Sequence, residues 1–516
     1  MRKTTAILVI AAWCVTAMAP VAAGASGTSG ASGTSGTSGA GLPMRPGTRG
    51  GPQQGMASRR GEAQAEREKQ AEAQPTLQMS LSEAIELAKG LSPRLGEFRA
   101  MVSLAEAGME RAEAEKLPHL STQAGYRRYN NVPDWTVNLG SEEILIFPNL
   151  PNLWFATLSG SYPLYTGGRV ESEVRAAERT IAASHKDLES QVANLELQVT
   201  SVYWQLVLAI EQERILAESI GSFEAHLFDA RNRQEVGLAA SNEALAVQTE
   251  RDRAELRRLL AASSVKTTED QLAVLLDLPV GTRIEPTDEL NLGAEPTLAV
   301  EALLATALEQ RSERQALKER IAAAEAKLQG ASSLKKPIIA INGSMSYLNP
   351  DRRVVPPKDE FRFAWDIGIG LTYDIYEGGS RNAVTDAALA ELDATRRRLE
   401  ELDRAIRTEV VQSYQNLETA RAAIGVSEQA ISSARENLRV TRDLYQQGII
   451  PSSERLDAEV AGLIAGLELT ESKIQAQLAS ASLQRSVGRS LQANQGPRMI
   501  KGSQLFPSTP TRQSPR

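Results

Sequence analysis

The sequence predicts a mainly helical chain with a small β part, in which one structural unit occurs twice. The motif Tyr-x-x-Tyr-x-Gly-Gly at residues 162–168 recurs at residues 373–379. Residues 366–375 alternate between apolar and polar or small side chains, which is the period of a β-strand. Residues 169–235 and 381–447 contain no proline and repeat apolar residues every three or four positions, which predicts two very long helices.

An internal duplication explains these matching signals. The spacing between the two Tyr/Gly motifs also relates Gly237 to Gly448 and Ser241 to Ser452. A constant spacing shared by strand, turn and helix signals indicates a repeated unit. The expected organisation is a first repeat at residues 77–276, a linker at 277–296 and a second repeat at 297–490.

Both ends of the chain have a different character. Residues 1–23 are typical of a secretory signal peptide, because Arg2 and Lys3 precede a short apolar run and a small-residue cleavage site. Cys14, the only cysteine, lies in that run, so we expect no disulfide in the mature chain. The low-complexity leader at 24–76 and the tail at 491–516 are expected to be disordered.

The composition argues against several functions. A net charge of −7 and the absence of a basic stripe with interleaved aromatic residues disfavour nucleic acid as a partner. His119, His185 and His226 are scattered without metal-ligand spacing, and no phosphate-binding loop or nucleophile elbow occurs. We therefore expect no metal, no cofactor and no enzymatic activity.

Each repeat is expected to contain the same elements in the same order. A helix precedes a strand pair, and a long helix and a shorter returning helix follow it. Two half-length helices stacked end to end would match one long helix. The expected helices are 81–116, 169–235 and 241–276 in the first repeat, and 298–335, 381–447 and 453–489 in the second. The long helices carry a coiled-coil seam of apolar residues at 188, 192, 195, 199, 202 and 206.

The strand pairs carry most of the aromatic residues of the chain. Each pair begins after Pro118 or Pro337 and is joined by a polar loop, at 130–151 or 349–359. Aromatic residues at both ends of alternating strands of about ten residues resemble the girdles of a transmembrane β-barrel. The alternative is a soluble strand pair packed on a core, but the helices supply no obvious layer to cover it.

Four strands are too few to close a barrel, and an open sheet edge is not tolerated in lipid. Several copies of the chain must therefore contribute strands to one shared barrel. The paired glycines that follow the strands, Gly167 with Gly168 and Gly378 with Gly379, predict sharp strand-to-helix turns.

These residues resemble the TolC family of outer-membrane channels, over roughly residues 76–490. The shared features are the duplication, the Tyr-x-x-Tyr-x-Gly-Gly strand exits, the long helices and the Gly-x-x-x-Ser helical tips. The resemblance implies a homotrimer with a 12-stranded transmembrane β-barrel and a trimeric α-barrel that projects through the periplasm. It also implies docking to a periplasmic adaptor protein, which links the channel to an inner-membrane transporter.

The resemblance places a gate at the second helical tip. Glu454 and Asp457 match the family's two acidic positions and lie three residues apart, so both face one side of the helix. In a trimer they would form two anionic rings that favour cations. Ordinary first-turn carboxylates, stabilised by the helix N-terminus, are the alternative. Ile450 replaces the arginine of the family, and Ala246 replaces the second acid in the first repeat.

The two tips are also candidates for adaptor docking. Gly237, Leu238 and Ser241 in the first repeat match Gly448, Ile449 and Ser452 in the second. We expect exposed apolar side chains there, with the serines capping the returning helices. Ordinary turn chemistry is the alternative explanation for Gly and Ser at these positions.

Two other functions remain open at the level of the sequence. The first is a soluble coiled-coil envelope or adaptor protein without a channel, against which the strand aromatics argue. The second lies within the family and is a type I secretion or metal-export channel in place of drug efflux. The sequence does not separate these channel types, because specificity is usually set by the transporter.

Overall fold

The structure, a computed structural model, describes residues 76–290 and 299–489. All of them belong to one unit of the chain, Glu72–Arg516. The expected signal peptide at 1–23 and the tail at 491–516 lie outside the described residues, as does the expected leader except for Thr76.

Eight helices are described, four in each repeat. The first repeat contains α2 (Leu81–Leu91), α3 (Pro93–Ala114), α4 (Arg169–Glu235) and α5 (Ser241–Leu275). The second contains α6 (Val300–Gln310), α7 (Ser312–Ser333), α8 (Ser380–Gln446) and α9 (Ser452–Val487). The order of the elements is the expected one, with two helices in place of one before each strand pair. Among the described helices, none combines the length and apolarity needed to cross a bilayer.

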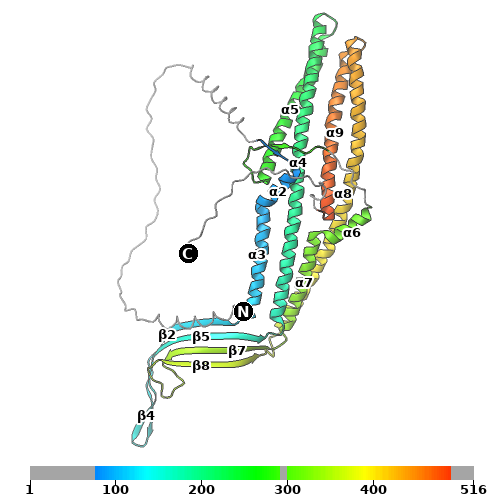
Figure 1. The fold of residues 1–516 in the computed structure, drawn as a ribbon. Coiled ribbons are helices and arrows are strands. Elements are labelled where there is room, and N and C mark those ends of the chain that lie inside the picture. The colour runs from blue at the N-terminus through cyan, green and yellow to red at the C-terminus, as the bar shows by residue number, and fades with distance from the viewer. Residues whose placement is uncertain (1–75, 291–298, 490–516) are drawn as a thin grey trace, which may run out of the picture. The chain divides into compact units, whose positions relative to one another are not determined.

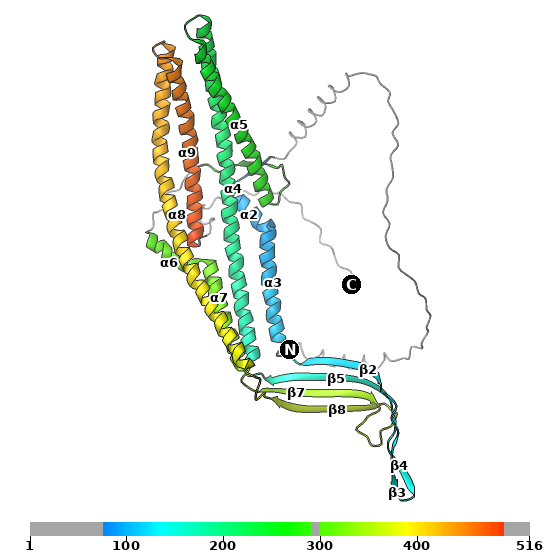
Figure 2. The ribbon, with the colours of Figure 1, turned by 180° about the vertical axis from the view of Figure 1, so that it is seen from behind.

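Helices α4 and α8 are the long continuous elements, with 67 residues each. Along α4, the end near the strands lies beside α3, and the end near the tip lies beside α5 (Figure 1, Figure 2). Helix α8 is accompanied in the same way by α7 and α9. The expected pairing of one continuous rod with one rod in pieces is therefore confirmed.

The predicted seam forms the core between these helices. Leu195, Val199 and Leu206 are buried, and Leu188 packs against them from a partly buried position. Residues at the matching positions of the second repeat, such as Ile406, are also buried. Each such aliphatic side chain contributes about 1.5–3 kcal/mol when it is removed from water, so the seam is a main source of stability.

The helices that precede the strands are each broken once, which differs from the single helices expected. Ser92 caps α3 by accepting a hydrogen bond from the backbone N–H of Leu95, and Pro93 starts that helix. Proline is favoured at a first helical position because its missing N–H would have no helical partner there.

The break between α6 and α7 lies at Arg311, whose buried guanidinium bonds Glu313 and Glu409. Arg485 of α9 bonds the same Glu313 and also Asn194 of α4, so this ion cluster joins four helices. Burial favours the neutral acid, but Arg485 and Arg311 outweigh it and lower the pKa of Glu313 to about 2.

The strands form one antiparallel four-stranded sheet with the order β2-β5-β7-β8. Its strands are β2 (His119–Arg128), β5 (Asn152–Tyr165), β7 (Ile338–Asn349) and β8 (Arg362–Thr372). Each repeat supplies one strand pair, as expected, and β5 joins β7 across the repeats. Strand β8 ends at Thr372, three residues before the alternating pattern in the sequence ends.

The register of the sheet separates an apolar face from a polar one. Tyr162, Ile341 and Ile369 lie opposite one another across three strands, as do Ser161, Asn342 and Gly368 one position away. Because paired residues share a face and neighbours alternate, the first row lies on the apolar face. This face also includes Trp154, Leu158, Met345, Tyr347, Trp365, Ile367 and Leu371.

Two small sheets were not predicted from the sequence. The expected polar loop at 130–151 contains a hairpin, β3 (Trp135–Leu139) with β4 (Glu142–Phe147). Strand β1 (Thr76–Met79) pairs in parallel with β6 (Arg283–Pro286), which lies in the expected linker.

The β1–β6 pair is attached to the middle of α4. The hydroxyl oxygen of the buried Tyr203 lies 2.8 Å from Asp288 Oδ2 and 3.1 Å from the backbone O of Met79, so its single proton is shared between these two acceptors. The backbone N–H of Leu81 also donates to Asp288. Met79 and Ile284 pack into the same core as Tyr203. We call these contacts of β1 and β6 with Tyr203 the clasp, and they hold α4 near its midpoint.

Candidate functional site at the helical tips

The tips of the two helical hairpins have the same backbone geometry. Gly237 and Gly448 adopt φ angles of 77° and 73°, in the left-handed region that favours glycine. The next residue in each tip donates a backbone hydrogen bond to the helix, from Leu238 to Arg233 O and from Ile449 to Leu444 O. These bonds satisfy carbonyl groups at the helix end and define Schellman motifs.

This geometry exposes one large apolar residue at each tip. Leu238 has 80% and Ile449 has 64% of its surface accessible. The glycine turn holds both side chains at the ends of rigid hairpins. Each hairpin therefore exposes one large apolar side chain, as the predicted docking role of the tips requires.

The expected capping by the serines is wrong. Ala240 and Pro451 occupy the N-cap positions of α5 and α9, without a side-chain capping bond. Ser241 and Ser452 are instead the first helical residues. Ser452 is buried, and its hydroxyl lies 3.0 Å from Nε2 of His226 on α4. The second serine therefore connects the two repeats.

Ser452 belongs to a polar cluster, buried except for Asp229, which we call the tip cluster. It comprises His226 and Asp229 of α4, Tyr445 of α8, and Ser452, Arg455 and Glu459 of α9. Glu459 Oε2 lies 2.8 Å from His226 Nδ1, and its other oxygen accepts a 3.1 Å bond from Arg455 Nε. Because a carboxylate only accepts hydrogen bonds, Nδ1 is the donor to Glu459.

The aromatic ring of Tyr445 completes the cluster. The guanidinium carbon of Arg233 lies 4.2 Å from the ring centroid, and that of Arg455 lies 5.2 Å from it. The ring also meets His226 edge-on. Burial raises the pKa of Tyr445, against the opposing effect of the two arginines. Arg233 further donates a 2.6 Å bond to the backbone O of Tyr445, which joins α4 to the end of α8.

Glu454 and Asp457 lie on the opposite side of α9 from this cluster. Both are exposed, whereas Arg455 and Leu456 between them are buried. Neither acid forms a hydrogen bond or ion pair within the described residues. The packing that buries Arg455 thus orients the acidic pair away from its own hairpins. This placement suits a ring between copies and equally suits solvated acids, of which only Glu454 lies in the first turn of α9.

Sequence reasoning missed the tip cluster because its members are remote from one another along the chain. His226 lies in the first repeat and Glu459 in the second, so no local spacing relates them. The one usable signal was polar residues at inward-facing positions: Ser452, Arg455 and Glu459 follow the helical three-to-four spacing of a packed face. No group of residues able to hold a metal ion occurs in the described ranges.

The glycine pairs lie at the other end of the long helices. Gly167, Gly168, Gly378 and Gly379 all have positive φ angles, between 60° and 94°. Gly168 and Gly379 immediately precede α4 and α8. The predicted strand-to-helix turns are therefore formed with left-handed backbone that L side chains rarely adopt.

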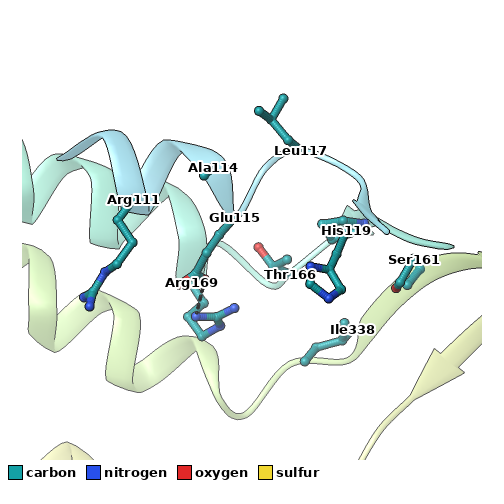
Figure 3. A pocket seen from close by; sticks show the side chains of 11 residues that line it. Arg111, Ala114, Glu115, Leu117, His119, Ser161, Thr166, Arg169 and Ile338 are labelled. Atoms are coloured by element: carbon teal, nitrogen blue, oxygen red, sulfur yellow. Dashed lines mark ion pairs between the residues drawn. The ribbon is translucent and has the colours of Figure 1, made fainter. Parts of the chain in front are cut away.

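A cavity of ≈ 490 Å³ lies beside the first of these turns (Figure 3). Its wall contains Arg111, Glu115, His119 and Arg169, where α3 and α4 meet the strands. Arg169 forms a 3.0 Å ion pair with Glu115 and also pairs with Glu173. Because His119 shares a face with Ser161, the cavity adjoins the polar face of the sheet.

The chain thus joins two long helical hairpins to a four-stranded antiparallel sheet with an exposed apolar face. The sequence profile of the family described as "Outer membrane efflux protein" matches residues 84–277 and 303–489. The chain therefore belongs to the outer membrane efflux protein family. The two matched segments correspond to the two repeats.

Individual relatives are similar at low sequence identity. The "Outer membrane protein TolC" of Vibrio cholerae is 22% identical over 418 residues, which cover 79% of this chain and 90% of that protein. The "Outer membrane efflux protein BepC" of Brucella suis is 22% identical over 328 residues, with coverages of 63% and 70%. The crystal structure of VceC from Vibrio cholerae aligns with a TM-score of 0.67 at 18% identity, covering 79% of this chain and 96% of that one.

Proposed function

We propose that three copies of this chain form a passive exit channel through the outer membrane. In this assembly each copy contributes four strands to a 12-stranded β-barrel, and the helices form an α-barrel in the periplasm. The channel conducts substrates when it is docked to a periplasmic adaptor and an inner-membrane transporter. Transport is passive, and no enzymatic step is assigned to the chain.

The single observation that carries this proposal is the chemistry of the four-stranded sheet. Its apolar face exposes large side chains, including Ile369 with 73% and Ile367 with 70% of their surface accessible. Both outer strands, β2 and β8, have an unpaired edge within the described residues. Lipid would cover the apolar face, and copies joined edge to edge would leave no strand edge in the membrane.

The helical tips support the docking part of the proposal. Leu238 and Ile449 present apolar surface at the tips of the two hairpins. These tips lie at the ends of the long helices that are remote from the strands (Figure 1). An adaptor that binds helical hairpins would meet these residues first. Gly237 and Gly448 would act by holding the turns that carry them, and Ser241 and Ser452 by starting the returning helices.

The acidic pair supports a gate at the same end. If Glu454 and Asp457 of three copies surround the aperture, their carboxylates attract cations and oppose the entry of anions. Changing both residues to alanine should raise single-channel conductance in planar bilayers and weaken cation selectivity. Glu468→Ala, at an exposed acid of the same helix that pairs with nothing in the described ranges, is the matched control. Unchanged conductance, selectivity and cation block in the double variant would place the constriction elsewhere.

Membrane fractionation followed by size analysis in detergent tests the channel itself. The mature protein should be recovered with the outer membrane and migrate as a trimer that conducts ions in planar bilayers. Recovery as a soluble monomer or dimer would instead support the alternative, a coiled-coil envelope or adaptor protein without a channel.

A further inference from the structure

The β3–β4 hairpin of the first repeat has no counterpart among the described strands of the second repeat. It projects beyond the end of the main sheet that is remote from the helices (Figure 1, Figure 2). Its two strands pair only with each other in the described structure, and Gly140, with a φ of 69°, forms the turn. Both outer edges of the hairpin are therefore available for contact.

The hairpin is unusually apolar for an exposed element. Trp135 is 60% exposed although its ring stacks on Phe147, and Ile144 and Leu145 are each about two-fifths exposed. An isolated two-stranded hairpin is marginally stable in water, and an exposed apolar edge strand favours association. The surface is therefore expected to be covered in the assembled protein.

The base of the hairpin is held in a defined position. The backbone N–H of Tyr129 donates a 2.7 Å hydrogen bond to Pro151 O, directly beyond the last pair of β2 and β5. Asn149 accepts from the backbone N–H of Val132, and its own N–H donates to Asp134. These bonds direct the hairpin as a continuation of the β2–β5 pair.

The order of the strands identifies what lies on each side of the hairpin. On its β5 side is the loop that joins β7 to β8 in the same chain, where Arg352 stacks 4.9 Å from the ring centroid of Tyr129. On its β2 side the described part of the chain offers no neighbouring strand. In a closed ring of copies, the β2 edge of one copy meets the β8 edge of the next, whose β7–β8 loop then lies beside the hairpin.

We propose that the β3–β4 hairpin of each copy docks on the β7–β8 loop, residues 350–361, of the neighbouring copy. The proposal rests on the proposed trimer. Two properties of the loop match the hairpin. Val355 and Phe361 of the loop are 59% and 49% exposed and can cover apolar side chains. Lys358 forms no ion pair in the described structure, and neither do the two exposed acids at the hairpin end, Glu142 and Glu143.

This contact would link the subunits outside the barrel. The hairpin end carries the two acids Glu142 and Glu143. In the loop, Asp351 pairs with Arg353 and Glu360 with Arg362, which leaves Arg352 and Lys358 against Asp359. The loop therefore has a small excess of positive charge that complements the acidic hairpin of the neighbouring copy. Hairpins that met one another on the threefold axis would instead bring like charges together, which is unfavourable. The structure thus favours a contact between hairpin and loop over a contact between hairpins.

Cysteine cross-linking tests the pairing directly, since Cys14 lies in the predicted signal peptide and no other cysteine occurs. Val137→Cys on the hairpin and Val355→Cys on the loop are combined in one full-length chain and treated with a short bis-maleimide in native membranes. The double variant should give covalent dimers and trimers on denaturing gels, and neither single variant should do so. Cross-linking of Val137→Cys alone would overturn the proposal in favour of hairpins that meet each other.

A charge-exchange series covers the case in which a cysteine variant assembles poorly. Glu143→Lys should lower the temperature at which the detergent-solubilised trimer dissociates, and combination with Lys358→Glu should restore it. The circular dichroism spectrum of every variant should match that of the parent, which shows that the fold of each chain is intact. If trimers form but the cysteines do not cross-link and Lys358→Glu does not restore stability, the hairpin docking is refuted and the trimer is not. If the unmodified protein forms no trimer, the proposed function itself is refuted.

Discussion

The tip cluster makes a quantitative prediction about how firmly the two repeats are joined near the proposed gate. In Glu459→Gln the side chain keeps its shape but loses its charge and one acceptor oxygen. Glu459 accepts bonds from His226 and Arg455 on different oxygens. With the amide oxygen facing Arg455, the NH₂ group faces His226, which can accept from it in the other tautomer and donate to Ser452 instead. The main loss is therefore the charge beside Arg455, which keeps only Asp229 as an ionic partner among the described residues.

The size of the effect follows from burial. The side chains of Glu459 and Arg455 are only 2% and 4% exposed, so water cannot replace the lost partner. A buried hydrogen bond to a charged group contributes about 1.5–3 kcal/mol, and breaking a buried ion pair costs about 3–5 kcal/mol. Since Asp229 remains, we expect a loss of about 2–4 kcal/mol in the free energy of local opening, equivalent to roughly 30- to 1000-fold.

Hydrogen exchange of the detergent-solubilised protein, followed by mass spectrometry, measures this quantity, because local opening controls the exchange of protected amides. Peptides from the end of α8 and the start of α9 should exchange faster in Glu459→Gln by that factor. Peptides from α7 should be unaffected, and Glu468→Gln should match the parent everywhere. If the tip peptides of Glu459→Gln exchanged like those of Glu468→Gln, the cluster would not hold the repeats together.

Three further predictions concern the sheet, the ion cluster and the tips. Ile369→Arg should reduce trimer assembly on gels far more than Thr372→Arg, because a charge on the lipid face costs about 2–4 kcal/mol at mid-bilayer; equal assembly would show that the faces are misassigned. The pKa of Glu313 is about 2 in the fold against a usual 4.5. The ionised carboxylate therefore stabilises the fold fully above pH 4.5, and this contribution is lost as the pH falls towards 2. Glu313→Gln should therefore be less stable than the parent in urea unfolding at pH 6, with a difference that shrinks below pH 4. Gly448→Ala should lower the free energy of unfolding by about 1–2 kcal/mol, because its positive φ disfavours any Cβ even though the surrounding space is open; Gly425→Ala, in helical backbone, is its control.

The elements that the sequence predicted well are those that local patterns determine. Helix α4 has no proline and a continuous apolar seam, and the alternation in β8 marks its two faces. The break before α3 also had a local signal, Ser92 followed by Pro93, which the helical periodicity around it concealed. The hairpin β3–β4 was hidden because its polar turn and tip suggested a loop.

The elements that the sequence did not predict depend on contacts between distant segments. Arg311 ends α6 without any helix-breaking residue, and its bonds reach Glu409 on another helix. The tip cluster joins His226 to Glu459 across the two repeats. Single-sequence patterns report which side of a helix is packed but not which helix lies opposite. The acidic pair Glu454 and Asp457 was placed on one face correctly, while its function as a gate remains a prediction.

The clasp around Tyr203 also determines how angular changes along α4 translate into displacement. Between Tyr203 and the end of the helix at Glu235 the chain rises about 50 Å, at about 1.5 Å per residue. A bend of about 5° in α4 at the level of the clasp therefore moves the tip by about 4 Å. The attachment of β1 and β6 at the middle of α4 thus sets the distance over which a small angular change becomes a displacement of the tip.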